Sequence, residues 1–233
     1  MAGAFTGFGP RALDFFRALA FHQDRAWFQE NRALHESDVV GPMGALVTDL
    51  AAELKRREMP LTGDPKRALF RINRDVRFSK DKRPFKTNAG AVLTRDGAKG
   101  NPGLLYLHLD PEGSFAAAGF YRPEPEQLAA LRARMRARPS DLAALDAALA
   151  AAGLAFADMD DLKRMPRGHE HVADPALARA LRRRHLIVRR PLAPEALLRP
   201  DLVGMLADFA EAARPVLDFG WRALQDLDPR SST

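Results

Sequence analysis

Hydrophobic residues in the first third of the chain recur every three or four positions, which places them on one face of an α-helix. Leu13, Phe16 and Ala20 follow this spacing, and Asp24 stands where a second helix needs an N-cap. The pattern predicts three helices, over residues 10–21, 24–31 and 41–57.

In the middle of the chain hydrophobic residues alternate with polar ones, the pattern of a half-buried β-strand. Residues 68–78 place Phe70, Ile72, Val76 and Phe78 on one face and Arg71, Asn73, Asp75 and Arg77 on the other, with Arg74 among the apolar positions. Similar runs predict strands over residues 88–95, 104–110 and 113–121. Turn-forming residues rather than helices separate these runs, so we expect an antiparallel meander.

The last part of the chain returns to helical spacing. It predicts helices over residues 125–138, 140–152, 175–184 and 200–224 and a strand over residues 185–192. Either Ser140 or Asp141 is expected to cap the second of these helices. The chain shows no internal repeat and no linker long enough to separate domains. We therefore predict one α+β domain over residues 1–233, in which an antiparallel sheet from the middle of the chain packs with N-terminal and C-terminal helices.

Composition excludes several classes of protein. The chain contains no cysteine, which rules out disulfides, thiolate metal sites and thiol nucleophiles. It has no apolar run of roughly 18 residues, the length that a conventional spanning helix requires. The first residues also lack the pattern of a secretory signal. We expect a cytoplasmic protein with no membrane partner.

The net charge of +6 is concentrated in one segment. Residues 71–88 read RINRDVRFSKDKRPFKTN, where seven Lys and Arg stand against two Asp, which gives +5 and leaves +1 for the rest of the chain. Three of the seven lysines lie within residues 80–86, although the chain otherwise prefers arginine. Because a compact ammonium and a planar guanidinium are not interchangeable, this enrichment indicates that side-chain identity matters there.

The segment is a candidate anion-binding site, since Arg and Lys recognise phosphate and carboxylate groups. The candidate ligand-binding residues are Arg71, Arg74, Arg77, Lys80, Lys82, Lys86, Thr87 and Asn88. Phe78 and Phe85 offer aromatic faces for stacking against a base. The alternative is a solvated cationic loop whose phenylalanines lie in the core and whose Asp75 and Asp81 form ion pairs.

Acid–base chemistry has three candidate residues, Asp75, Asp81 and His108. Neighbouring cations favour the charged form of a carboxylate, which suits a base better than an acid. The alternative role of both aspartates is to orient the surrounding Arg and Lys side chains. His108 shares a strand face with Tyr106, and a histidine can transfer protons near neutral pH. The run at residues 169–171 (HEH) lacks further ligands and the order H-E-x-x-H, so no metal site is predicted. The sequence does not identify a cofactor.

The central segment also carries a family pattern. The matching residues are 74–82 (RDVRFSKDK) and 84–88 (PFKTN), supported by Trp27-Phe28, Asn31-Arg32, Tyr106-Leu107-His108-Leu109 with Pro111, Gly119 to Tyr121 with Pro123-Glu124-Pro125, Leu162-Lys163-Arg164 and Arg167-Gly168. Through these residues the chain resembles the bacterial family catalogued as domain of unknown function 2461, and the resemblance extends over about residues 5–224. The resemblance implies a single-domain α+β fold and no particular activity. Because Lys163 and Arg164 belong to the family-like segments, we expect them to complete the central site.

Three functions are compatible with these observations. The favoured one is a site for a small phosphorylated or nucleotide-like anion, because the charge is focused in a short segment. The second is a nucleic-acid-binding module that uses the same cations to neutralise several phosphates. The third is a structural or interaction protein whose motif binds no ligand. Catalysis and oligomeric state do not follow from the sequence.

Overall fold

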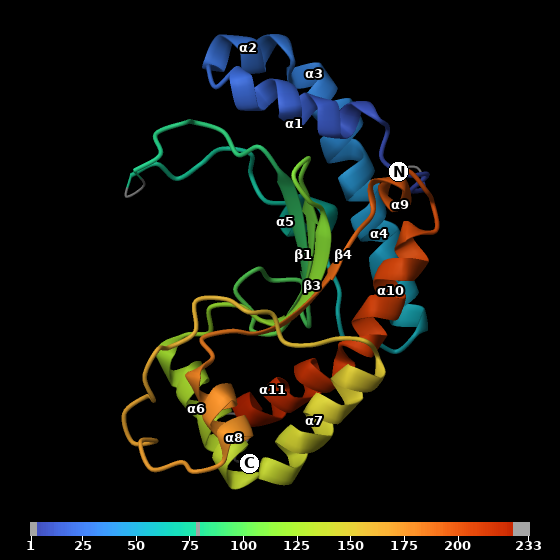
Figure 1. Ribbon diagram of the computed structural model, residues 1–233. Helices are drawn as coiled ribbons and strands as arrows, with labels where there is room; N and C mark the ends of the chain where they lie inside the picture. Colours follow the sequence, from blue (N-terminus) through green and yellow to red (C-terminus); the bar gives the residue numbers. More distant parts are fainter. Residues whose placement is uncertain (1–3, 78–79, 226–233) are drawn as a thin grey trace. The chain divides into compact units, whose positions relative to one another are not determined.

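The computed structural model describes residues 4–77 and 80–225 (Figure 1). The chain forms two compact units. The first comprises the residues up to Asn101 together with Leu105–Ala116 and Arg190–Phe209. The second comprises Pro102–Leu104, Ala117–Arg189 and the residues from Ala210 on. The single domain over residues 1–233 stays a prediction, and each unit is described by itself.

Helices of the first unit come mainly from the N-terminal part of the chain. They are α1 (Arg11–Phe21), α2 (Arg25–Glu30), α3 (Arg32–Leu34), the π-helical segment η1 (His35–Val40), α4 (Gly41–Arg56) and α5 (Pro65–Ala68). The side chain of Asp24 caps α2 by accepting a hydrogen bond from the backbone N–H of Trp27 at 2.8 Å. The three helices predicted for this region are therefore confirmed, whereas α3, η1 and α5 were not predicted.

The sheet has four antiparallel strands in the order β1-β2-β3-β4. They are β1 (Ala89–Thr94), β2 (Leu104–Leu109), β3 (Phe115–Phe120) and β4 (Leu186–Pro191). Strands β2, β3 and β4 each have residues in both units. On β2 the leucines at positions 105, 107 and 109 are buried, and Tyr106 and His108 lie half-buried on the opposite face. The predicted α+β fold and antiparallel meander are confirmed.

The strand predicted over residues 68–78 is wrong. Helix α5 ends at Ala68, and the following segment makes isolated bridges, from Leu69 to Ala91 and from Asn73 to Phe85. Beside the second bridge, the backbone N–H of Arg74 donates to the carbonyl of Pro84 at 2.9 Å. Proline has no N–H to return, so the ladder ends there. Residues 71–77 and 80–88 instead form two arms between α5 and β1 (Figure 1), which we call the basic loop.

Helices of the second unit follow the predictions with small shifts. They are α6 (Pro125–Ala137), α7 (Pro139–Ala151), α8 (Pro175–Arg182) and α11 (Arg214–Gln225). Helix α6 packs against α7, α8 and α11, and α7 also packs against α11. The predicted cap of α7 is wrong, because the helix already begins at Pro139, before Ser140 and Asp141, and no side chain caps it.

The single closing helix predicted over residues 200–224 is also wrong. The chain forms α10 (Leu202–Ala212) and α11, with a break at Ala213. Pro215 accounts for the break, since it has no N–H and its ring clashes with the carbonyl four residues earlier. A short helix, α9 (Pro194–Leu197), precedes α10 and was not predicted.

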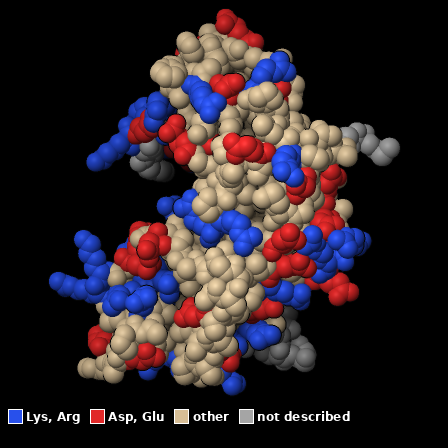
Figure 2. Space-filling model, turned by 45° about the vertical axis from the view of Figure 1, so that its right-hand side comes forward, with Lys and Arg blue, Asp and Glu red and all other residues tan. Residues whose placement is uncertain are grey.

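Groups of Lys and Arg and groups of Asp and Glu are scattered over the face drawn in Figure 2, with larger areas of other residues between them. This mixture agrees with a nearly neutral chain outside residues 71–88. In the part of the chain that the structure describes, no helix is both long and apolar enough to span a bilayer.

Candidate functional site

The basic loop is held together by pairing between its two arms. Besides the bond from Arg74 to Pro84, the backbone N–H of Lys86 donates to the carbonyl of Ile72 at 2.8 Å. Phe85 anchors the second arm: it is 3% exposed, and its ring stacks on that of Phe28 with centroids 4.6 Å apart. The predicted stacking of a ligand on Phe85 is therefore wrong. Phe78 lies outside the described residues.

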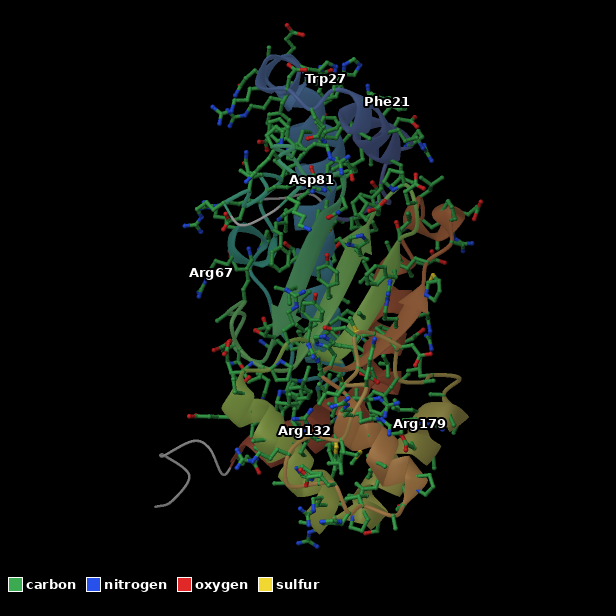
Figure 3. The ribbon with its side chains drawn as sticks, turned by 60° about the vertical axis from the view of Figure 1, so that its left-hand side comes forward. Phe21, Trp27, Arg67, Asp81, Arg132 and Arg179 are labelled. Carbon is green, nitrogen blue, oxygen red and sulfur yellow. The ribbon has the colours of Figure 1, made fainter. Side chains whose placement is uncertain are left out.

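Asp81, labelled in Figure 3, links the two arms through Arg74 on the other arm and also pairs with Arg83 on its own arm. Its carboxylate lies 2.5 Å from Arg74 and 2.7 Å from Arg83. Arg74 also donates through Nε to the carbonyl of Phe85 at 2.9 Å. Hydrogen bonds from Arg83, supported by the charge of Arg74, hold the pKa of Asp81 well below its usual range. These contacts favour the orienting role for Asp81, and its catalytic role stays a prediction.

Asp75 also forms an ion pair with an arginine of the loop. Its carboxylate pairs with Arg77 at 2.7 Å and accepts the backbone N–H of the same residue at 3.2 Å. These hydrogen bonds lower the pKa of Asp75 to about 2. Both aspartates thus bind the arginine two positions later, the local geometry of an Asx turn. Lys82 completes the loop by donating to the carbonyl of Val76 at 2.9 Å.

A second group of cations gathers around an exposed aromatic ring at the base of the loop. Phe70 is 43% exposed, and the ammonium groups of Lys99 and Lys86 lie 4.7 and 5.9 Å from its centroid. The Tyr106 ring meets Phe70 edge-on, with centroids 6.0 Å apart. We call Phe70, Arg71, Lys86, Lys99 and Tyr106 the Phe70 cluster.

The cations of the Phe70 cluster are oriented by backbone carbonyls. Lys99 donates to Leu69 at 2.5 Å, and Lys86 donates to the carbonyl of Arg71 at 2.8 Å. Burial lowers the pKa of Lys99, and the charges of Arg71 and Lys86 lower it further. Burial and the charge of Arg74 lower the pKa of Lys86. Among the described residues no carboxylate forms an ion pair with Arg71, Lys86 or Lys99, so their charges remain uncompensated.

Beside this cluster, three polar side chains form a hydrogen-bonded series along β2. Tyr106 Oη lies 2.9 Å from His108 Nδ1, and His108 Nε2 lies 3.3 Å from Asp110 Oδ2. We call Tyr106, His108 and Asp110 the β2 triad. The predicted acid–base candidate His108 therefore has a partner on each ring nitrogen, which is the arrangement of a general base whose ring is oriented by a third group.

The remaining predicted ligand-binding residues belong to both units. Lys80 is exposed on the loop, and Thr87 and Asn88 are half-buried just before β1. Lys163 and Arg164 are exposed residues of the second unit, between α7 and α8, and their membership of the site stays a prediction.

Sequence reasoning missed four members of the two groups. Phe70 was placed on the apolar face of a predicted strand, but its ring is exposed. Lys99 lies outside the basic segment, in residues assigned to a plain turn, and no sequence signal connects it to Phe70. Tyr106 and Asp110 carry a usable signal, because residues two positions apart on a strand share a face. The spacing Tyr106-x-His108-x-Asp110 therefore places all three side chains side by side.

A second basic surface lies within the second unit, on α6. It is a groove of about 700 Å³ lined by Ala129, Arg132, Ala133, Arg136, Ala137, Pro166, Arg167 and His169. Arg132, labelled in Figure 3, and Arg136 donate to backbone carbonyls, at 2.9 Å to Leu181 and 3.1 Å to Gly168. Burial and the charges of Arg136 and Arg132 lower the pKa of His169. This α6 groove is a second place where an anion can be attracted.

Comparison with known proteins identifies the family of the chain and no closer relative. Over the described ranges 4–77 and 80–225, no three His, Asp or Glu side chains are grouped to hold a metal ion. No curated protein and no solved structure matches the chain. A family model described as a conserved hypothetical protein, DUF2461, matches residues 11–219. The match covers most of the chain and includes the basic loop, the Phe70 cluster and the β2 triad. The chain belongs to the family of conserved hypothetical proteins with domain of unknown function 2461.

Proposed function

We propose that the first unit binds a small phosphorylated or nucleotide-like anion at the Phe70 cluster. One observation carries the proposal: Lys86 and Lys99 converge on one exposed ring, Arg71 lies near enough for its charge to lower the pKa of Lys99, and none of the three has a carboxylate partner among the described residues. The arginines of the loop behave differently, since Arg74, Arg77 and Arg83 are all paired with aspartates. The loop arginines therefore build the scaffold, and the Phe70 cluster supplies the unpaired positive charge.

The donors of the cluster suit a phosphate group. Lys86 and Lys99 each give one N–H to a backbone carbonyl, and an ammonium has three, so each keeps two for a ligand. Arg71 adds a planar fork that binds phosphate oxygens in pairs. Phe70 provides an aromatic surface directly beside these donors. A phosphate attached to a flat ring, as in a mononucleotide, matches both features.

A short cluster favours a small ligand over a nucleic acid. Binding to duplex DNA weakens with salt by about 0.9 log unit per log unit of salt for each phosphate neutralised. Three cations in one short cluster can contact one or two phosphates, whereas an extended nucleic-acid interface needs positive charge along a surface. A mononucleotide and a short oligonucleotide compared at two salt concentrations separate the two functions.

The test uses AMP and inorganic pyrophosphate as probes, with thermal unfolding and isothermal titration as readouts. Each charge-assisted hydrogen bond contributes about 1.5–3 kcal/mol, so losing one weakens binding about 10- to 100-fold. We expect this loss in Lys99→Met and Arg71→Met. Lys66→Met is the matched control, because Lys66 is an exposed lysine of the same unit outside the cluster.

Two outcomes would contradict the proposal. One is that neither probe binds the wild-type protein. The other is that the Lys99→Met and Arg71→Met variants bind as tightly as Lys66→Met. Loss of binding in Arg167→Gln instead would move the anion site to the α6 groove of the second unit.

A further inference from the structure

The β2 triad has a defined direction of hydrogen bonding. An ionised carboxylate only accepts, so Asp110 takes the proton of His108 Nε2–H across the 3.3 Å contact. A neutral imidazole carries one proton, which leaves Nδ1 as an acceptor. The 2.9 Å contact at Nδ1 is therefore a hydrogen bond donated by the phenolic O–H of Tyr106. Asp110 fixes the tautomer, and His108 in that tautomer acts as a base toward Tyr106.

Packing holds each member of the triad in place. Asp110 accepts the backbone N–H of Glu112 at 2.8 Å through its second oxygen, and its own N–H donates to Ser114 at 3.1 Å. The His108 ring stacks on Phe115 with centroids 4.6 Å apart. The side chains of His108 and Asp110 are 18% and 17% exposed. Because the triad is partly shielded from water and fixed in position, each of its hydrogen bonds is stronger than the same bond would be in water.

Tyr106 shares an aromatic neighbour with two cations. Its ring contacts Phe70, and the ammonium groups of Lys86 and Lys99 lie beside the same Phe70 ring. The hydroxyl of Tyr106 has a base on one side, which is the condition that activates a weak nucleophile or acid.

We propose that Tyr106 is the acid–base residue of the site and that His108 and Asp110 act through it. In the forward step a hydroxyl of the bound ligand transfers its proton to Tyr106 Oη, while the Tyr106 proton moves to His108 Nδ1. The products are a ligand oxyanion and an imidazolium balanced by the Asp110 carboxylate. The reverse transfers restore the starting state. The contact with ligand rests on the proposed function, whereas the activation of the Tyr106 hydroxyl does not.

Activation can be measured without knowing the substrate. Benzenesulfonyl fluoride reacts with an activated tyrosine: the phenolic oxygen bonds to sulfur, fluoride leaves and the phenolic proton passes to the neighbouring base. The chain has two tyrosines, and Tyr121 is an internal control. Tyr121 is 48% exposed and stacks on His185, but both nitrogens of His185 are engaged elsewhere, by the Arg122 N–H and by Asp160. Exposure and the Arg122 guanidinium, 5.3 Å from the Tyr121 ring centroid, both predict faster labelling of Tyr121, whereas the base at the Tyr106 hydroxyl predicts faster labelling of Tyr106.

The experiment measures labelling rates of both tyrosines by mass spectrometry of the full-length protein's peptides. We expect Tyr106 to react at least tenfold faster than Tyr121. His108→Phe keeps an aromatic ring against Phe115 and removes the base, and should cut the Tyr106 rate about tenfold. Asp110→Asn should cut it several-fold, and neither variant should change the Tyr121 rate. A Tyr106 rate no higher than that of Tyr121, or one that His108→Phe leaves unchanged, would overturn the proposal.

Two further measurements separate folding and ligand binding from activation. Nitrogen NMR of the wild-type protein should show His108 protonated at Nε2, and protonation at Nδ1 would overturn the triad even if the variants fail to fold. Saturating AMP should slow the labelling of Tyr106 and not that of Tyr121. Fast labelling without protection by AMP would overturn the contact with ligand and support the activation. Protection without preferential labelling would support anion binding and overturn the activation.

Discussion

Gly90 on β1 lies against the ring of Tyr106, so replacing it with alanine tests the geometry of the β2 triad. A Cβ built at this position lies 2.5 Å from Tyr106 Oη and 2.8 Å from Cε2. Ordinary contacts of this kind are about 3.5 Å or longer. The tyrosine ring must therefore move by about 1 Å. Such a shift lengthens the 2.9 Å hydrogen bond to His108 beyond useful range.

The stability of the protein should change little in the same variant. The atoms that the new methyl group meets all belong to the far end of one half-buried side chain. Replacing Gly with Ala also reduces the entropy of the unfolded chain, which favours folding by about 0.4–1 kcal/mol where the backbone allows it. We expect the free energy of unfolding of Gly90→Ala to stay within about 1 kcal/mol of the wild-type value.

The labelling of Tyr106 by benzenesulfonyl fluoride is the assay for this prediction. A displacement of about 1 Å at a reacting group costs up to about 100-fold in rate, so a tenfold or greater loss is expected. Gly100→Ala is the matched control, because a Cβ at Gly100 meets nothing within 4 Å. Unchanged Tyr106 labelling in a folded Gly90→Ala protein would refute the reasoning.

Three other predictions concern stability and the loop. Phe120→Ala should lower the free energy of unfolding by about 3–5 kcal/mol in urea, because this ring is 1% exposed and lies against Gly220; a loss below about 1 kcal/mol would contradict the packing. Asp81→Asn should speed hydrogen exchange at the amides of Arg74 and Lys86. Folding lowers the pKa of Asp81, so the ionised carboxylate adds to the free energy of unfolding at any pH above its unfolded pKa of about 3.9. This contribution is lost as the pH falls through the folded pKa, and the variant should show no such pH dependence. Arg132→Gln should cost about 1–3 kcal/mol in thermal unfolding, since its guanidinium donates to carbonyls at the end of α8, and Arg138→Gln, an exposed neighbour, should cost little.

Strand β2 shows why part of the fold could be predicted. Its leucines alternate with polar residues, and one buried face of a sheet fixes that register strongly. The same alternation correctly placed Tyr106 and His108 on the other face. The basic loop shows the opposite case. Its alternation at Phe70 and Ile72 resembles a strand, but Pro84 on the opposite arm ends the pairing, and pairing partners are not visible in local spacing.

The candidate site was predictable to a similar extent. Net charge located the segment, but charge counts do not distinguish an arginine held by an aspartate from a lysine held by a carbonyl. The spacing Asp75-x-Arg77 and Asp81-x-Arg83 contains the information for the ion pairs, because an Asx turn brings the second residue back to the first. The approach of Lys99 to Phe70 depends on the fold and has no counterpart in the sequence.

The β2 triad occupies five consecutive positions of one extended segment, and this has a consequence for protein design. The pleat of the strand sets the spacing of the three side chains, and Gly90 on the adjacent strand leaves room for the tyrosine. No distant loop has to be placed for the three groups to meet. The arrangement is therefore portable as one hairpin and the strand beside it: the Tyr-x-His-x-Asp segment, the turn residues that hold Asp110, the phenylalanine stacked on the histidine and one facing glycine all lie on three neighbouring strands of an antiparallel sheet and the turn between two of them.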